Sequence, residues 1–171
     1  MRLLFKSLSL VVAISGLAIA AAPAATAASS PAGDSGVTVV RVYTDWRDGA
    51  SFKRISEYFS GKENTGGTVV LRTHAEQRSG FYFFIRINNP GAPVAVKVNV
   101  AVVTPTDKQM KDFSFATHLK SGSNLYDLGL TGEDWLDAKA NPVAWKVDFV
   151  AADGRVIASE KSYLWEKPVS K

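Results

Sequence analysis

The sequence predicts an all-β protein, an immunoglobulin-like two-sheet β-sandwich with one short helix in a connection. Apolar and polar side chains alternate with period two along several segments, most clearly over residues 94–103, as in a sheet with one buried face. Turn signals, and not long helices, separate these segments. Seven to nine such strands bury their apolar faces by stacking as two sheets. Because the chain has no cysteine, the Cys–Trp–Cys pattern of true immunoglobulin domains is missing, and the prediction concerns architecture alone.

The strands are expected, in chain order, at residues 37–44, 68–74, 81–88, 94–103, 111–119, 125–130, 143–149 and 156–165. Most of them are rich in β-branched or aromatic residues. The pair Asp153-Gly154, between the last two, is the strongest hairpin signal. In the strand at 81–88, the alternate residues from Phe81 to Ile87 form one face, and Tyr82, Phe84 and Arg86 lie on the other.

The stretch between the first two strands is ambiguous. Phe52, Ile55, Tyr58 and Phe59 recur at spacings of three and four, which favours a short helix. Ser51 would cap its start and Gly61 its end. An alternating strand with Ile55 and Phe59 inward is the alternative. The helix would be the natural cover for the two rings on the polar side of the strand at 81–88.

The N-terminal residues have the order of a secretory signal peptide. Arg2 and Lys6 are positively charged, residues 8–22 are apolar and uncharged, and small residues at 25–27 form a cleavage site. We expect cleavage after Ala27, a signal peptide at 1–27, and export to the periplasm or the extracellular space. An uncleaved anchor is the alternative, although a spanning helix usually needs about 20 apolar residues.

The remaining chain divides into a flexible segment at residues 28–36, rich in Ser, Pro, Ala and Gly, and a β-sandwich domain at residues 37–168. Lys97 and Asn99 interrupt the most apolar segment of the domain. We therefore expect no stable membrane span after the signal peptide is cleaved.

Composition narrows the classes of partner. The absence of cysteine excludes disulfide scaffolds and thiol chemistry. Of the 20 Lys and Arg residues, Arg2 and Lys6 lie in the signal peptide, which leaves 18 against 16 Asp and Glu. These charges are interspersed, whereas a nucleic-acid-binding surface is a basic cluster. We expect no nucleic-acid partner.

No catalytic motif stands out. The G-x-S-x-G motif of serine hydrolases is missing, and His74 and His118 lack the neighbouring ligands or partners that a zinc site or a catalytic base requires. We expect no catalytic residue, no metal and no cofactor.

An enzyme is nevertheless the alternative hypothesis: a polymer-acting hydrolase or lyase that uses acidic residues of the 127–137 region. It predicts that carboxylates from this region converge in a cleft and that at least one has a raised pKa. The simpler interpretation is a solvated turn. The acidic residues concerned are Asp127, Glu133, Asp134 and Asp137.

Aromatic side chains are the stronger functional candidates. Trp46 and Trp135 are expected in loops, where an exposed ring can stack on a sugar or anchor a protein, or can fold back as a lid over the sandwich. Tyr82 and Arg86, on the polar face of their strand, indicate either a covered face or a contact patch. Arg72 and Arg78 are expected near Arg86, as ordinary cross-strand ion pairs.

These four residues, Trp46, Trp135, Tyr82 and Arg86, are the predicted ligand-binding residues. The predicted function is that of an exported, non-enzymatic β-sandwich that binds or scaffolds a glycan or an envelope protein. A structural subunit that assembles by strand addition at a sheet edge is a further hypothesis.

Two segments, GLTGEDW at residues 129–135 and SYLWEKP at residues 162–168, resemble parts of a family of small exported bacterial proteins of unknown function. The stretch PVAW at residues 142–145 lies between them. The resemblance covers most of the domain. It implies a sandwich fold and carries no activity or site residue with it.

Overall fold

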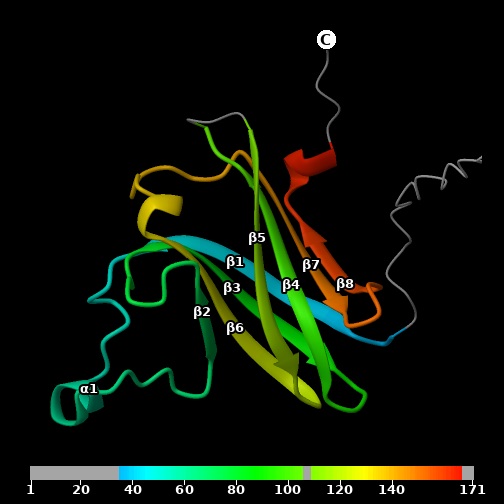
Figure 1. Ribbon diagram of the computed structural model, residues 1–171, viewed down its shortest axis with the longest axis horizontal. Helices are drawn as coiled ribbons and strands as arrows, with labels where there is room; N and C mark the ends of the chain where they lie inside the picture. Colours follow the sequence, from blue (N-terminus) through cyan, green and yellow to red (C-terminus); the bar gives the residue numbers. More distant parts are fainter. Residues whose placement is uncertain (1–34, 106–108, 167–171) are drawn as a thin grey trace, which may run out of the picture.

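The protein forms two four-stranded β-sheets packed face to face (Figure 1). This computed structural model describes residues 35–105 and 109–166. In sheet order, sheet A comprises β1 (Thr38–Arg47), β3 (Gly80–Asn89), β6 (Gly122–Thr131) and β2 (Val69–Arg72). Sheet B comprises β5 (Met110–Leu119), β4 (Val94–Val103), β7 (Ala144–Ala151) and β8 (Val156–Lys161). Outside the sheets lie helix α1 (Ile55–Ser60) and two short 3₁₀ helices, η1 (Gly132–Asp134) and η2 (Tyr163–Glu166).

The prediction of a mostly-β protein with two sheets and one short helix is confirmed, and the eight strands of the described residues fall within the expected range. Sheet B is antiparallel throughout, whereas sheet A is mixed because β2 runs parallel to β6. The expected signal peptide, residues 1–27, and most of the expected flexible segment, residues 28–36, lie outside the described residues. Within the described part of the chain, no helix is both long and apolar enough to cross a membrane.

Period-two alternation builds the core between the sheets. On β3, the inward residues Phe81, Phe83, Ile85 and Ile87 are each at most 2% exposed. They face the valines of β4, and Leu128 and Phe149 complete the centre from β6 and β7. Burial of each such side chain contributes about 2 kcal/mol, so the alternation that predicts the strands also supplies the force that holds them together.

Two tryptophans lie in other elements than expected. The predicted loop position of Trp46 is wrong, because β1 continues to Arg47 and Trp46 is a strand residue that packs, half-buried, against the core. Pairing of Trp46 with Phe81 on β3 overrides the local turn signal. The last strand ends at Lys161, so Trp165 lies in η2 and not at a strand end.

Residues 48–68, here called the arm, leave sheet A between β1 and β2 and project away from both sheets (Figure 1). The arm contains α1, so the predicted helix is confirmed, and Gly61 ends it in the left-handed conformation at φ 66°. The predicted cap at Ser51 is wrong. Arg54 is the N-cap residue, and Ser51 instead closes a turn with Asp48 through a 3.2 Å backbone hydrogen bond.

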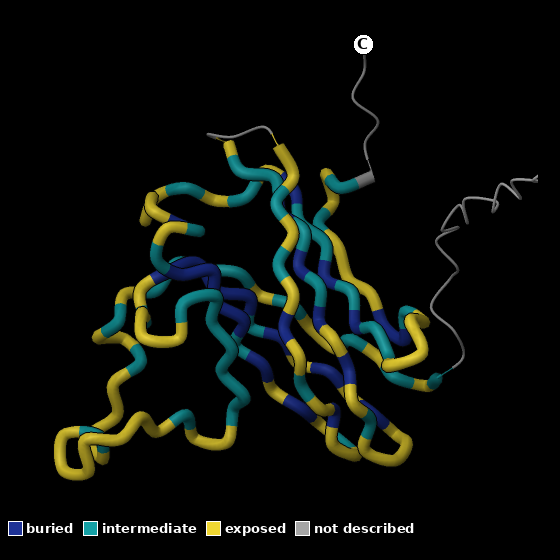
Figure 2. The backbone as a smooth tube through the Cα atoms, in the orientation of Figure 1, coloured by how far each residue is buried: buried dark blue, intermediate teal, exposed yellow. Residues whose placement is uncertain are grey.

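The arm covers sheet A with one side chain and not with its helix. Phe52, which precedes α1, packs on Tyr82 with 4.6 Å between ring centroids. The helical residues Ile55, Tyr58 and Phe59 are 75% to 88% exposed, and Figure 2 shows this tip of the arm as exposed chain. The expectation that the helix itself covers the sheet is therefore wrong, because its apolar residues point away from the protein.

A close approach on the outer face of sheet A requires glycine at position 129. A Cβ atom there would lie 2.6 Å from the Tyr82 ring. The ring is clamped, since Phe52 lies over it and its hydroxyl bonds to Arg72 and to the Arg78 carbonyl. It cannot swing aside without breaking these contacts.

We expect Gly129→Ala to lower the free energy of unfolding by about 2 kcal/mol, because the added methyl group overpacks a site that cannot relax. Urea unfolding followed by circular dichroism measures this loss. Gly91→Ala is the control, since its Cβ would lie 3.4 Å from the nearest neighbouring atom. Equal stability of the two variants would contradict the clamped geometry.

Candidate functional site

Strand register arranges the outer face of sheet A in three rows, because paired residues of neighbouring strands point to the same side of a sheet. The first row is Asp45, Tyr82, Gly129 and Arg72, the second is Tyr43, Phe84, Asp127 and Val70, and the third is Arg41, Arg86 and Leu125. The arm closes the first row, and the other two rows line an open groove.

The first row is closed by a hydrogen-bond network around Tyr82, whose side chain is fully buried. The Nε of Arg72 donates to the Tyr82 hydroxyl at 2.9 Å, and the hydroxyl donates to the backbone carbonyl of Arg78 at 2.7 Å. The Arg72 guanidinium also lies 5.7 Å from the Phe52 ring centroid. Burial raises the pKa of Tyr82, so the hydroxyl stays protonated and keeps its role as donor.

Two glutamates of the arm neutralise the arginines of this network. Glu63 accepts both terminal N–H groups of Arg72, at 3.0 and 2.5 Å, and Glu57 accepts from Nη1 of Arg78 at 2.7 Å. These hydrogen bonds lower the pKa of both carboxyl groups. The Arg72–Glu63 pair is bidentate, and bidentate arginine–carboxylate pairs are among the strong hydrogen bonds in proteins. Together with the single Arg78–Glu57 bond, it fastens the arm to sheet A.

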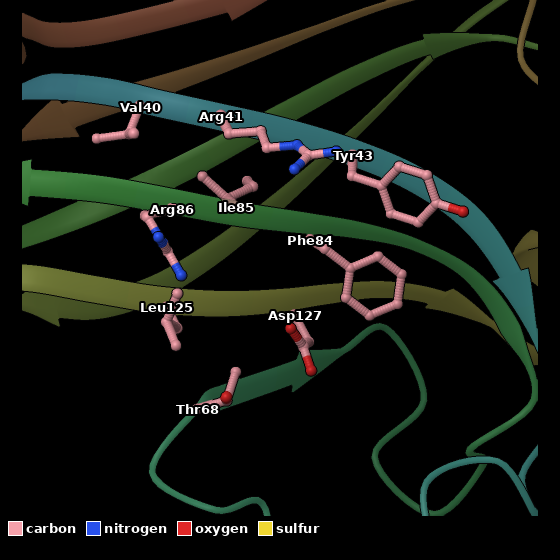
Figure 3. A pocket seen from close by; sticks show the side chains of 9 residues that line it. All are labelled: Val40, Arg41, Tyr43, Thr68, Phe84, Ile85, Arg86, Leu125 and Asp127. Carbon is pink, nitrogen blue, oxygen red and sulfur yellow. The ribbon is translucent and has the colours of Figure 1, made fainter.

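The groove beside the closed row has a volume of about 480 Å³ (Figure 3). Its lining residues are Val40, Arg41, Tyr43, Thr68, Phe84, Ile85, Arg86, Leu125 and Asp127. The rings of Tyr43 and Phe84 lie 5.9 Å apart, centroid to centroid, and Tyr43 is 45% exposed. A register shift between Val39 and Arg41 inserts Val40 as an extra residue on edge strand β1. Such a β-bulge re-aims neighbouring side chains.

Two adjacent cations stand at the open end of the groove. Arg41 and Arg86 are direct cross-strand partners, and both are exposed. Neither guanidinium makes an ion pair or a side-chain hydrogen bond with any residue that the structure describes, whereas the guanidinium groups of Arg72 and Arg78 are both paired with carboxylates. Like charges directly opposite each other on a sheet are destabilising. An anion placed between the two guanidinium groups would relieve this repulsion.

Asp127, on β6, is the carboxylic acid among the residues that line the groove. It faces Phe84 in the second row, and Figure 3 shows its carboxyl group between Phe84 and Thr68. It also borders a smaller depression, of about 150 Å³, between sheet A and the arm. Burial raises its pKa to about 6, against the opposing effect of Arg72. The carboxyl group thus changes between a hydrogen-bond donor and a pure acceptor near neutral pH.

The other acids of the expected cluster lie elsewhere. Glu133, Asp134 and Asp137 border a separate depression of about 220 Å³ beside η1, whereas Asp127 lies on the outer face of sheet A. Asp134 contacts Nε2 of His74 at 3.2 Å. Among the described residues, no three His, Asp or Glu side chains come together as a metal site.

The four predicted ligand-binding residues do not form one site. Trp135 is 6% exposed and stacks on Phe81 at 4.5 Å between centroids, and Trp46 is half-buried at the core. Their burial fits the alternative interpretation, in which both rings fold back over the sandwich, better than exposed rings available to a ligand. Tyr82 is buried in the hydrogen-bond network of the first row and does not line the groove, whereas Arg86 does. Whether these residues bind a ligand stays a prediction.

Sequence reasoning missed Arg41, Tyr43 and the place of Asp127. They belong to the groove through the pairing of β1 and β6 with β3. The polar-face pattern of the strand at 81–88 is the signal that could have led to them, once that strand was assigned a central position. Nothing local reports which strands flank it.

We expect Asp127→Asn to stabilise the protein at neutral pH. The native state holds the Asp127 proton more tightly than the unfolded chain, because its pKa rises from 3.8 to about 6. The ionised group therefore costs stability above this pH, and the cost disappears as pH falls toward the unfolded value. Partial exposure screens the charge, so we expect a gain of about 1 kcal/mol above pH 6, which shrinks to almost nothing as the pH falls toward 3.8.

Urea unfolding above pH 6 and near pH 4 measures the effect. The control is Asp112→Asn, at an exposed position, which should lack the gain in stability above pH 6 that Asp127→Asn shows. The burial of Asp127 is contradicted if Asp127→Asn and the unaltered protein have the same pH dependence.

Comparison with known proteins leaves the chain without an assigned family. No family model matches it, and no curated protein matches it significantly. The resemblance to small exported bacterial proteins therefore stays a prediction, and the functional argument depends on the side chains of sheet A.

Proposed function

We propose that the protein is an exported, non-enzymatic binding protein that holds an acidic glycan in the groove of sheet A. The proposal rests on Arg41 and Arg86, whose exposed guanidinium groups have no carboxylate partner among the described residues. The rings of Tyr43 and Phe84 lie beside them in the groove. Arginine forks fit carboxylates in bidentate geometry, and an acidic ligand would remove the repulsion between them.

A sugar chain fits the other groups of the groove. The half-exposed ring of Tyr43, with Phe84 beside it, offers an apolar face for a pyranose ring. Asp127, at the inner end, can accept hydrogen bonds from sugar hydroxyls when ionised. The groove is open along the sheet face, which suits one or two units of a longer polymer more than a small molecule that must be enclosed.

The compartment and the fold type belong to the same proposal. The signal-peptide pattern of residues 1–27 supports export to the periplasm or the extracellular space. The two-sheet architecture supports an immunoglobulin-like sandwich, although the parallel β2–β6 pair distinguishes sheet A from a purely antiparallel sheet. Membership of a family of small exported bacterial proteins is also part of the proposal, and the segments at residues 129–135 and 162–168 support it.

The alternative function is a polymer-acting hydrolase or lyase. The raised pKa of Asp127 favours it, because a general acid needs such a pKa. The location of the other three acids of the 127–137 region around a different depression weighs against the hydrolase, since glycoside hydrolysis generally needs two carboxylates across one cleft. Release of reducing ends or unsaturated products from an acidic glycan would favour the enzyme over the binding protein.

Titration calorimetry with oligogalacturonate as the acidic probe and a cello-oligosaccharide as the neutral probe tests the proposal. We expect binding of the acidic chain only. Arg86→Gln should weaken it about tenfold, because a charge-assisted hydrogen bond contributes about 1.5 kcal/mol. Tyr43→Ala should weaken it by a similar factor through the lost stacking area.

Arg155→Gln is the matched control, since Arg155 is an exposed arginine in the β7–β8 turn, paired with Asp153. It should bind the acidic probe as the unaltered protein does. Absence of binding, equal binding of the neutral probe, or an Arg86→Gln variant with unchanged affinity would overturn the acidic-glycan proposal.

A further inference from the structure

The tip of the arm is an apolar surface that the fold does not use. Ile55, Tyr58 and Phe59 are 78%, 75% and 88% exposed, and α1 contains no buried residue. Three large apolar side chains on one six-residue helix form a patch that soluble surfaces usually avoid. The arm carries this patch far from both sheets (Figure 1).

Polar contacts, and not the exposed apolar side chains of α1, hold the tip of the arm in shape. A Glu57 oxygen accepts from the backbone N–H of Asn64 at 3.1 Å, and the Asn64 amide donates to the Ser56 hydroxyl at 2.8 Å. The backbone N–H of Gly61 closes the helix on the Glu57 carbonyl at 2.9 Å. Ile55, Tyr58 and Phe59 are thus presented on an ordered loop without contributing to its folding.

The glutamates of the arm are paired with arginines outside it, whereas its lysines are exposed beside α1. Two acids of the arm, Glu57 within α1 and Glu63 after it, pair with Arg78 and Arg72 respectively. The lysines on either side of the helix, Lys53 and Lys62, are exposed, and Lys53 lies 6.0 Å from the Tyr58 ring centroid. The tip therefore combines apolar side chains with positive charge, while the compensating negative charge is used at the base.

We infer that the tip of the arm docks on an anionic lipid bilayer. Apolar and aromatic side chains flanked by lysines are the surface that partitions into the interface of a membrane with acidic headgroups. Charge complementarity selects the lipid: the rings would enter the interface, while Lys53 and Lys62 would contact the headgroups. This docking surface is separate from the groove of sheet A and does not depend on the glycan proposal.

A single-cysteine label tests the inference without ambiguity, because the chain contains no other cysteine. Ser60→Cys, at the exposed end of α1, carries an environment-sensitive fluorophore, and Ser121→Cys, in the exposed β5–β6 turn, carries the same label as control. Because the signal is local to the arm, membrane association through residues 1–27 would not produce it in the full chain.

With vesicles of phosphatidylcholine and about one third phosphatidylglycerol, we expect a blue shift and quenching by brominated lipid for the label at position 60 only. Pure phosphatidylcholine vesicles should give a much smaller shift. A label that stays in water while the protein sediments with vesicles would overturn the inference.

Variants of the tip give the second measurement. We expect the double variant Ile55→Ser/Phe59→Ser to bind the anionic vesicles at least tenfold more weakly, through the lost apolar burial. The pair Lys53→Gln/Lys62→Gln should lose roughly fivefold per lysine. The controls are Leu136→Ser, at a site 85% exposed in another loop, and Lys120→Gln/Lys139→Gln, at exposed lysines outside the arm.

Because the substituted side chains at the tip are mostly exposed, unfolding temperatures should stay unchanged and confirm that the variants fold. Equal vesicle binding of the tip variants and the controls would overturn the inference, as would no binding of the unaltered protein to anionic vesicles. A concentration-dependent dimer that the Ile55→Ser/Phe59→Ser variant loses, with no vesicle binding, would replace the bilayer with a second copy of this chain.

Discussion

The contact of the Tyr82 ring with the bare backbone at Gly129 is the constraint on which the outer face of sheet A depends. The ring can lie flat across β6 because no Cβ intervenes. Its hydroxyl then meets Arg72 from one side and the Arg78 carbonyl from the other. Phe52 of the arm closes over this arrangement. One buried phenol thereby connects three separate segments of the chain and separates the closed part of the face from the open part.

The closed and open parts differ in how their charges are satisfied. In the closed part, each arginine has a carboxylate from the arm. In the open part, Arg41 and Arg86 are exposed and have no carboxylate partner among the described residues, and Asp127, the acid among the residues that line the groove, is half-buried. The same sheet face thus contains two arginines that are paired with carboxylates and two whose guanidinium groups have no carboxylate partner among the described residues. This asymmetry is the reason for regarding the groove, and not the network, as the binding site.

The sequence predicts the inward faces of the strands well, because alternation along β3 and β4 is a local pattern. It predicts Trp46 badly, since its turn-like neighbours Asp45 and Arg47 pair with each other at 3.3 Å within a continuing strand. Helical spacing identifies α1 but carries no information on which way its apolar residues point. The groove was beyond local reasoning, because its rows depend on the β-bulge at Val40 and on strands that pair far along the chain.

The parallel pairing of β2 with β6 sets the order in which the outer face can be completed. His74 and Thr131, which bond just beyond this pair, are 57 residues apart in the chain. During synthesis, the arm and β2 therefore emerge well before β6, the strand with which β2 pairs. Until β6 pairs with β3, the Tyr82 ring lacks its contact with the backbone of Gly129, against which Phe52 of the arm holds it. Loop closure over this distance carries an entropic cost, which the contacts of the completed sheet A must offset.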